Sequence, residues 1–487
     1  MTERPKNCDF VLFGVLGDLS RRKLLPALYQ LDRSGLLSSG TRIIGTARND
    51  LTADEALKRV EKTLREFVAK GDFDNDLLVH FCKRFHYVQM DFSEESDYTN
   101  LKDTLQAEHT AIFYLATPPA MYATICAGLE QQGLAKQPAR VILEKPIGHN
   151  LDSSQEINQA VARYFEENQV YRIDHYLGKE TVLNLLALRF ANALFSSNWD
   201  NNAIDHIQIT AAEQVGVEGR WGYYDDAGQL RDMVQNHLLQ VLSLIAMEPP
   251  SRLDAESIRE EKLKVLKALR PIDESNCQEV TVRGQYQSGF VADQRVPGYL
   301  EEDGARNNSQ TETFVALKVN IDNWRWSGVP FYLRTGKRMP EKCSEVVITF
   351  KKQLHNIFND TAMELPPNKL VIRLQPDEGV EVQILNKIPG LGKRMHLKAT
   401  NLDLSFNETF EKKRIADAYE RLLLEAMQGN QYLFVHRDEV EYAWRWIDGI
   451  VAAWESNEQP PKAYQAGTWG PVASVSLLAH DGRQWDE

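Results

Sequence analysis

The sequence predicts an α/β N-terminal domain, Rossmann-like and doubly wound, followed by an α+β C-terminal domain with a large, mainly antiparallel sheet. Up to about residue 180, short apolar runs alternate with helical stretches, which is typical of βαβ units around a buried parallel sheet. After about residue 200, period-two alternation between tight turns replaces that pattern. A chain of 487 residues is also too long for one ordinary core. We therefore expect domains at 1–180 and 181–487.

Composition and charge exclude several classes of protein. The chain is 43% hydrophobic and 26% charged, as in a globular protein, and its net charge of −13 argues against nucleic-acid binding. The N-terminus lacks a signal-like apolar stretch, and no apolar run is long enough to cross a membrane. Five cysteines lie far apart without a C-x-x-C pair, so we expect free thiols, no metal site and a cytoplasmic location.

The elements of the first domain follow in order along the chain. Strands are predicted at 10–14, 42–48, 86–91, 111–119, 140–146 and 169–174. A helix is expected from about 23 to 34, where Pro26 is tolerable only in the first turn. Another helix should begin after Thr52, since Glu55 three residues later completes a capping-box pattern. The last predicted strand, 169–174, ends at the carboxyl edge of the sheet. In open α/β sheets, ligands bind at this edge.

The second domain combines alternating strands with helices. Residues 313–322 place Val315, Leu317, Val319 and Ile321 on one face, which predicts a strand with one covered face. Residues 369–387 resemble two strands joined by a Pro-Asp-Glu-Gly turn. Helices are expected at 228–248, 411–428 and 438–454.

A glycine pair after the first strand suggests a nucleotide site. Gly14 and Gly17 lack a Cβ, so the backbone can turn sharply and bring a pyrophosphate to the helix N-terminus. The pair departs from the usual G-x-G-x-x-G, and the alternative is a strand-to-helix turn without a ligand. Arg48, at the end of the second strand, suits the extra phosphate of NADP, although Asp50 nearby is the residue type that NAD sites use.

The stretch "YRIDHYLGKE" (171–180) puts Asp174, His175, Tyr176 and Lys179 within six positions. In an acidic chain, an anionic ligand needs such a local group of cations. We interpret the stretch as a pocket for a small anion beside a proton-transfer group; the alternative is a solvated loop.

His237 lies within the apolar stripe of the helix predicted at 228–248. A lone histidine there is more often a core residue than a catalyst. Because the nucleotide domain shows no base of its own, His237 is nevertheless the candidate to accept a hydroxyl proton, with an ordinary pKa near ~6.5. A carboxylate such as Asp174 would orient it, but spacing cannot show that the two meet.

A basic stretch at 332–343 contains Arg334, Lys337, Arg338 and Lys342 around a glycine. Its density of positive charge suggests a second anion site, with a basic solvated loop as the alternative.

Six motifs in order resemble the glucose-6-phosphate dehydrogenase family over essentially the whole chain. They are "GDLSRRKLLPALY", "EKPIG", "RIDHYLGKE", "RDMVQNHLLQ", "FYLRTGKRM" and "RLQPDEG". The resemblance implies oxidation of the C1 hydroxyl of glucose 6-phosphate to 6-phosphogluconolactone with hydride transfer to NADP, the first step of the oxidative pentose phosphate pathway. It also implies a homodimer or homotetramer that assembles through the second domain.

The resemblance further implies roles for individual residues. His237 would be the general base and Asp174 its carboxylate partner. The substrate-binding residues would be His175, Tyr176, Lys179, Glu213, Asp232, Lys337, Lys342 and Lys145. The cofactor-binding residues would be Gly14, Gly17, Asp18, Leu19, Arg48, Asp91, Thr117 and Lys145. Only the resemblance selects Asp232, because on an ideal α-helix it lies nearly opposite His237.

Two other classes of protein share some of these features, and the sequence departs from part of the family at one position. Relatives of glucose-fructose oxidoreductase share the E-K-P motif but usually show a G-x-G-x-x-G turn and lack the "RIDHYLGK" stretch. A non-catalytic NADP-sensing regulator would be signalled by loss of the base or of that stretch, and both are present. Trp469 stands where members with a second, structural NADP site place an arginine, so such a site is not predicted.

Overall fold

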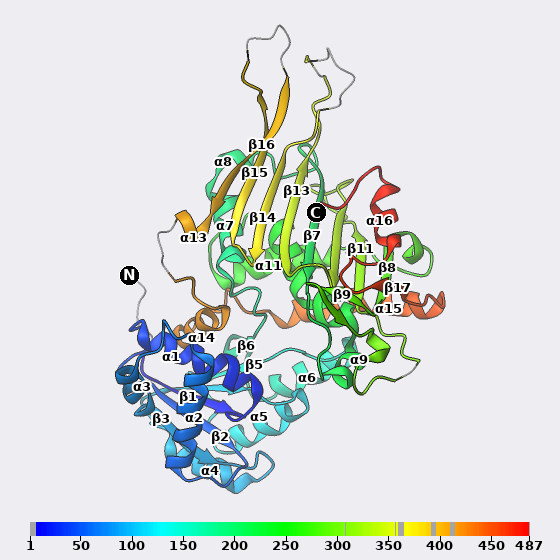
Figure 1. Cartoon of the computed structure of the whole chain (residues 1–487). Helices are drawn as coiled ribbons and strands as arrows, with labels where there is room; N and C mark the ends of the chain where they lie inside the picture. Colours follow the sequence, from blue (N-terminus) through cyan, green and yellow to red (C-terminus); the bar gives the residue numbers. More distant parts are fainter. Residues whose placement is uncertain are drawn as a thin grey trace. The chain divides into compact units, whose positions relative to one another are not determined.

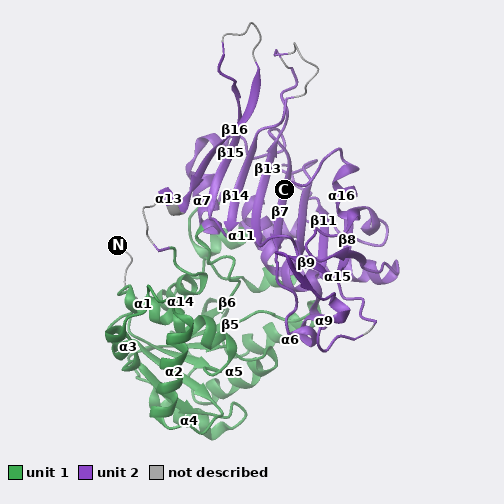
Figure 2. Cartoon of the chain, in the orientation of Figure 1, with its two compact units in different colours: residues 1–180, 250–260, 415–441 green, residues 181–249, 261–414, 442–487 purple. Residues whose placement is uncertain are grey.

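The computed structural model describes residues 6–306, 308–355, 357–358, 365–390, 396–409 and 414–486 (Figure 1). The chain divides into two compact units (Figure 2). Unit 1 comprises 1–180, 250–260 and 415–441, and unit 2 comprises 181–249, 261–414 and 442–487. Two later segments thus belong with the first 180 residues, whereas the sequence analysis assigned them to the second domain.

Unit 1 is built on a parallel sheet of six strands in the order β3-β2-β1-β4-β5-β6. Its strands are β1 Cys8–Phe13, β2 Arg42–Ala47, β3 Phe85–Gln89, β4 Thr110–Leu115, β5 Arg140–Leu143 and β6 Val170–Arg172. The order reverses between β1 and β4, as in a doubly wound Rossmann sheet, and ligands bind at such a reversal. The predicted fold class and all of its expected strands are confirmed in this unit.

The helices of unit 1 connect these strands, except for α14, which comes from a later part of the chain. They are η1 Ser20–Leu24, α1 Leu25–Arg33, α2 Ala53–Phe67, α3 Asn75–Cys82, α4 Glu95–Thr104, η2 Pro119–Met121, α5 Tyr122–Gln131, α6 Leu151–Ala162, η3 Glu167–Gln169 and α14 Ala418–Gln428. The predicted capping box at α2 is confirmed: Thr52 Oγ1 accepts from Glu55 N at 3.3 Å, and Glu55 Oε2 accepts from Thr52 N at 2.9 Å.

The segment 415–441 joins unit 1 because β6 is an edge strand whose polar backbone groups need partners. Val435 N donates to Arg172 O at 3.0 Å, in an isolated antiparallel bridge. Beside it, the rings of Tyr171 and Phe434 meet edge to face with centroids 4.8 Å apart. Nothing local in the sequence records this pairing, since its partners are separated by more than 250 residues.

Unit 2 contains a mixed sheet of nine strands in the order β16-β15-β14-β13-β7-β12-β11-β8-β17. Its strands are β7 Ile204–Ala212, β8 Thr281–Gln287, β11 Phe314–Val319, β12 Phe331–Gly336, β13 Cys343–Phe350, β14 Lys369–Gln375, β15 Gly379–Lys387, β16 Leu397–Ser405 and β17 Lys462–Gln465. A separate hairpin pairs β9 Gly289–Val291 with β10 Gln294–Val296. The β7–β12 and β8–β17 pairs are parallel and the other pairs are antiparallel, which confirms a large, mainly antiparallel sheet.

The strand β11 departs from the expected pattern of one covered face. Phe314 and Ala316 are as fully buried as Val315 and Leu317. The prediction was wrong because an aromatic cluster that includes Tyr299, Tyr464 and Trp485 covers the second face. The hairpin of β14 and β15 is confirmed, and β14 alternates between buried and half-buried residues.

The helices of unit 2 accompany this sheet in the chain, and α7, α11 and α15 lie at boundaries between the units in sequence. They are α7 Glu180–Ala191, α8 Ala193–Ser196, α9 Trp221–Gln229, η4 Leu230–Leu238, α10 Leu239–Ala246, α11 Ala255–Lys267, α12 Cys277–Val280, η5 Tyr299–Glu301, α13 Phe406–Thr409, α15 Arg437–Ser456 and α16 Val472–Ala479. Of the helix predicted at 411–428, the part at 411–413 lies outside the described residues, 414–417 is not helical, and α14 confirms 418–428.

The helix predicted at 228–248 is interrupted near its start. Gly228 has φ +72° and ψ 168°, which separates α9 from the segment that continues as η4 and α10. η4 is a π-helix, with hydrogen bonds between residues five apart.

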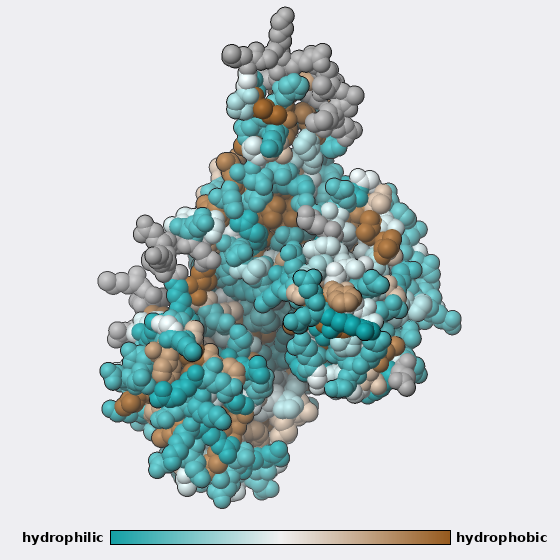
Figure 3. All heavy atoms as spheres, viewed as in Figure 1, coloured by the Kyte–Doolittle hydropathy of each residue, from teal (hydrophilic) through white to brown (hydrophobic). Residues whose placement is uncertain are grey.

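Hydrophilic residues predominate on the face drawn in Figure 3, with apolar residues scattered among them. None of the helices in the described parts of the chain combines the length and apolar content that a bilayer crossing requires.

Candidate active site

The turn after β1 has the geometry that the glycine pair predicted. Gly14 has φ +84°, and a Cβ built there would lie 2.7 Å from Ala116 O, so only glycine fits. Gly17 N donates to Gly14 O at 3.0 Å, which closes the turn, and Ser20 Oγ donates to the same carbonyl at 2.9 Å. Asp18 is exposed and pairs with Arg22 at 2.7 Å. The first helix therefore begins where a phosphate could approach the backbone, beside Leu19.

Thr117 supplies a polar group that lacks a protein partner. Its Oγ1 is buried and has no hydrogen-bond partner in the described part of the chain. A Cβ built on Gly14 would lie 3.6 Å from Thr117 Cγ2. Thr117, just after the carboxyl end of β4, therefore lies beside the glycine turn. A buried hydroxyl without a partner is costly, and a bound dinucleotide would relieve that cost. The turn and Thr117 therefore fit a dinucleotide.

Arg48 and Asp91 line one open pocket with side chains of β3 and α4. Arg48 is exposed, and its guanidinium forms no ion pair with any described residue. Asp91 is held in a turn, since its Oδ1 accepts from Ser93 N at 3.0 Å and its own N donates to Asp97 at 2.8 Å. A cation at the end of β2 is thus available to an anionic ligand, as the sequence predicted.

The segment after β6 brings its polar side chains together in a compact turn. Asp174 is 2% exposed, and its Oδ1 accepts from Tyr176 N at 2.9 Å. The Lys179 ammonium lies 3.8 Å from the centroid of the Tyr176 ring, and the His175 and Tyr176 rings are 5.2 Å apart. The structure therefore confirms the juxtaposition of His175, Tyr176 and Lys179, and contradicts a solvated loop.

The start of α14 supports this turn from a distant part of the sequence. The Tyr419 ring stacks on His175, with centroids 6.3 Å apart and an angle of 10° between the planes. A Cβ on Gly178 would lie 2.6 Å from Ala418 O, so the two backbones touch. Asp417 caps α14 and pairs with Lys23 at 3.1 Å. Tyr419 was not predicted as a site residue, since no local signal in the sequence connects it to His175.

A buried acid, Glu144, lies next to Lys145 and was also missed. Burial raises the pKa of Glu144, while hydrogen bonds from Tyr114 and Tyr419 oppose that rise. Tyr122 donates to Glu144 O at 2.9 Å. The Glu144 carboxyl thus joins β4, β5 and α14 through tyrosine hydroxyls, directly before Lys145 in the chain.

In unit 2, the carboxyl ends of β7 and β12 lie side by side because these strands are parallel. Glu213 follows β7 and Lys337 follows β12; Lys337 Nζ lies 2.8 Å from Glu213 Oε2. Lys342 directly precedes β13, whose first residue Cys343 pairs with Ala212 at the end of β7, so Lys342 belongs to the same edge. Lys342 is exposed, whereas Lys337 is 7% exposed.

The other two cations of the basic stretch do not belong to an anion site. Arg334 is 1% exposed, with its guanidinium carbon 4.5 Å from the Trp469 ring and 4.3 Å from the Trp485 ring. Arg338 donates to Glu302 at 3.4 Å. The prediction that all four cations form one site was wrong, because β12 directs Arg334 into the aromatic cluster.

The π-helical hydrogen bonding of η4 changes the relation between Asp232 and His237. On an α-helix, residues five apart lie nearly opposite each other. In a π-helix the hydrogen bond joins residues i and i+5. Asp232 and His237, which are five residues apart, therefore lie on nearly the same side of η4. The two residues were predicted on opposite sides because α-helical geometry was assumed. His237 is 1% exposed, and its N donates to Asn236 Oδ1 at 2.6 Å.

Two models of one protein family together match most of the chain. Residues 11–184 match "Glucose-6-phosphate dehydrogenase, NAD binding domain", and residues 186–486 match "Glucose-6-phosphate dehydrogenase, C-terminal domain". The chain belongs to the glucose-6-phosphate dehydrogenase family. The resemblance inferred from the motifs is confirmed, and with it an oxidoreductase that oxidises glucose 6-phosphate and has a dinucleotide-binding domain.

Individual glucose-6-phosphate dehydrogenases agree over the full length. A glucose-6-phosphate 1-dehydrogenase of Dickeya dadantii (strain 3937) is 59% identical over 488 residues, covering 100% of this chain and 99% of that protein. One of Rhizobium meliloti (strain 1021) is 51% identical over 482 residues, covering 98% and 97%. A solved glucose-6-phosphate dehydrogenase in complex with its substrate glucose-6-phosphate has a TM-score of 0.90 at 36% identity, with 100% of both chains covered.

Proposed function

We propose that this dehydrogenase uses NADP as its dinucleotide and that His237 is the base for C1 oxidation. Arg48 carries the choice of NADP: it is exposed at the end of β2, forms no ion pair among the described residues, and lines a pocket with Asp91. The 2′-phosphate that distinguishes NADP from NAD suits such a guanidinium.

The residues of unit 1 around β1 would hold the dinucleotide. Gly14 and Gly17 admit the pyrophosphate, and Thr117 offers its buried hydroxyl. Asp18, Leu19, Asp91 and Lys145 complete the proposed set. NADP, when bound, accepts the hydride from C1.

The sugar phosphate would be held by His175, Tyr176 and Lys179. The Lys179 ammonium is already placed over the Tyr176 ring, so little reorganisation is needed to bind a phosphate. Glu213 and Asp232 would accept hydrogen bonds from sugar hydroxyls. Lys337, Lys342 and Lys145 would add positive charge, with Lys337 held by its ion pair to Glu213.

His237 would remove the proton of the C1 hydroxyl as hydride leaves the same carbon. A buried imidazole needs a carboxylate to orient it and to stabilise the imidazolium, and we assign that role to Asp174.

A spectrophotometric assay tests the proposal. We expect absorbance of the reduced cofactor with glucose 6-phosphate and NADP, much less with NAD, and much less with free glucose. His237→Asn should lower kcat roughly 10²-fold or more and change KM for glucose 6-phosphate little, because the phosphate contacts remain. The exposed His480→Asn is the control and should behave like the parent. A folded His237→Asn enzyme with parental kcat would show that His237 is a core residue.

We also propose a homodimer or homotetramer. The cytoplasmic location stays a prediction from the sequence, which cell fractionation would test.

A further inference from the structure

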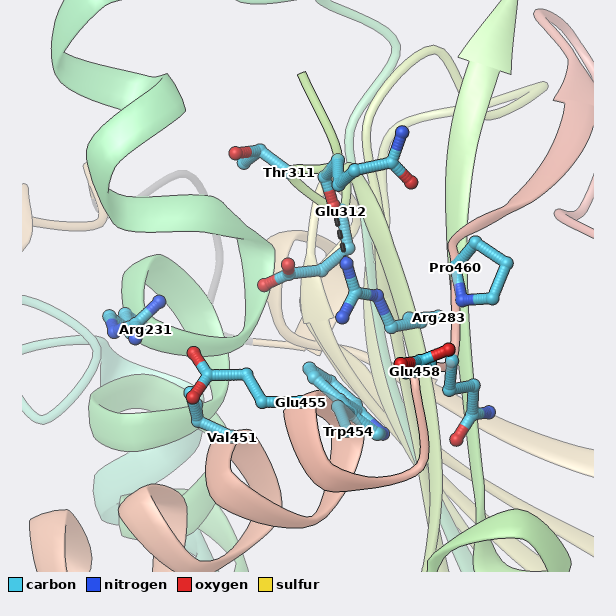
Figure 4. A pocket seen from close by; sticks show the side chains of 11 residues that line it. Arg231, Arg283, Thr311, Glu312, Val451, Trp454, Glu455, Glu458 and Pro460 are labelled. Carbon is cyan, nitrogen blue, oxygen red and sulfur yellow. Dashed lines mark hydrogen bonds between the residues drawn. The ribbon is translucent and has the colours of Figure 1, made fainter. Parts of the chain in front are cut away.

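Glu312 is a buried acid that the proposed chemistry does not use. It precedes β11, is 5% exposed, and lines an open pocket in unit 2 (Figure 4). Burial raises the pKa of Glu312, and the charge of Arg283 opposes that rise. A buried carboxylate needs a compensating contact, so the groups that it bonds indicate its role.

Glu312 bonds the start of the helix that carries Asp232 and His237. Its Oε1 accepts from Leu230 N at 3.1 Å, and its backbone O accepts from Gln229 N at 2.9 Å. Leu230 opens η4, where backbone N–H groups lack partners within the helix. A Cβ on Gly228 would lie 2.4 Å from Glu312 Oε1, so the kink leaves room for the carboxylate.

The cations beside Glu312 have other contacts. Arg283 lies beside Glu312 in Figure 4; it donates to Gln310 O, and its guanidinium carbon is 5.1 Å from the Trp454 ring. Arg231 donates to Ala227 O at 3.2 Å. No ion pair within 4.0 Å joins Glu312 to a cation in the described part of the chain. Leu230 N therefore donates directly to the Glu312 carboxylate, whereas the charge of Arg283 acts on it over a longer distance.

Residues 312–313 are also bonded to the edge of the sheet that carries Glu213 and Lys337. Lys337 N donates to Thr313 O at 2.9 Å. Tyr224 OH donates to Gln229 Oε1 at 2.6 Å and approaches Glu312 O at 3.3 Å, and Lys337 Nζ lies 5.1 Å from the Tyr224 ring. Residues 312–313 therefore connect the start of η4 with Lys337.

We propose that Glu312 is a positioning residue, whose carboxylate fixes the first turn of η4 and thereby the placement of Asp232 and His237 for proton transfer. The proposal rests on the proposed function, because it assigns importance to those two side chains. Small displacements of a catalytic group are costly for turnover, whereas binding of the dinucleotide in unit 1 should not depend on Glu312.

The test compares two substitutions in the full-length enzyme. Glu312→Met keeps the length of the side chain and removes the acceptor, so we expect kcat for glucose 6-phosphate to fall roughly tenfold to hundredfold, with KM for NADP unchanged. Glu312→Gln keeps an acceptor oxygen and should restore most of kcat. Glu455→Gln alters an exposed acid of the same pocket and should match the parent.

Hydrogen–deuterium exchange over residues 228–240 gives a readout that does not depend on catalysis. Exchange should accelerate there in Glu312→Met and stay parental in Glu312→Gln. Parental kcat or parental exchange in a folded Glu312→Met enzyme overturns the proposal. If that variant does not fold, a folded Glu312→Gln enzyme with a comparable tenfold loss overturns it as well. Parental turnover of His237→Asn would instead contradict the proposed function, and the exchange result would still show whether Glu312 holds the helix.

Discussion

Arg48 is the residue at which the preference for one dinucleotide is tested most directly. Arg48→Ala should raise KM for NADP roughly tenfold to a hundredfold, the cost of losing about 1.5–3 kcal/mol from a charge-assisted contact. KM for NAD should change little, because NAD lacks the 2′-phosphate. Steady-state kinetics with both cofactors provide the measurement, and Arg163→Ala, an exposed arginine at the end of α6, is the control. Equal increases for NAD and NADP would contradict a role in phosphate recognition.

Lys179 is the residue at which the proposed binding of the sugar phosphate is tested most directly. Lys179→Ala should weaken glucose 6-phosphate binding roughly tenfold to a hundredfold and lower kcat as well, since remote binding energy also positions C1. The low activity with free glucose should hardly change.

The decisive quantity for Lys179 is the ratio of kcat/KM for glucose 6-phosphate to kcat/KM for glucose, measured in parent and variant. Lys136→Ala removes an exposed lysine of the same unit and should leave this ratio intact. If the ratio also survives Lys179→Ala, Lys179 is not a phosphate ligand.

At the scale of elements, α14 is the helix whose contribution the sequence did not reveal. Its Tyr419 stacks on His175 and hydrogen bonds the buried Glu144 carboxyl. Tyr419→Phe keeps the stacked ring and removes the hydroxyl, whereas Tyr419→Leu removes both. We expect KM for glucose 6-phosphate to rise severalfold in Tyr419→Leu and less in Tyr419→Phe, with KM for NADP less affected. Substrate titrations of both variants provide the measurement, and equal KM values in parent and Tyr419→Leu would contradict support of His175 by α14.

The π-helix η4 shows how an element can mislead a residue-level argument. Sequence periodicity located the helix correctly and placed His237 among its buried residues. It separated Asp232 from His237, because the period that it assumed was 3.6 residues per turn. The i+5 hydrogen bonds of η4 begin next to the kink at Gly228 and the carboxylate of Glu312.

At the scale of the whole molecule, we expect an oligomer that forms through unit 2. β16 is an edge strand, and Leu402 and Leu404 on one of its faces are 60% and 44% exposed. Light scattering should give twice or four times the chain mass of 55.6 kDa. Leu402→Glu should shift the enzyme to smaller species, whereas Val79→Glu on α3, another exposed apolar residue, should not. A monomeric parent would contradict this expectation.

The sequence by itself determined the features that depend on local order. Buried strands alternating with helices indicated the Rossmann sheet, and the Thr52 capping box marked the start of α2. Gly14 was predictable because a backbone with positive φ favours glycine. The close grouping of His175, Tyr176 and Lys179 was visible because neighbours in a tight turn remain neighbours in space.

Only the tertiary structure decided the features that depend on distant pairing. Residues 415–441 join unit 1, and Tyr419 reaches His175, because the edge of β6 and the buried Glu144 require partners. Arg334 is directed between two tryptophans by its place on β12, although Lys337, three residues later, pairs with Glu213. Glu312 bonds the start of η4 from more than 80 residues away. A buried polar group takes the partner that lies nearest in space, and sequence spacing carries no record of that distance.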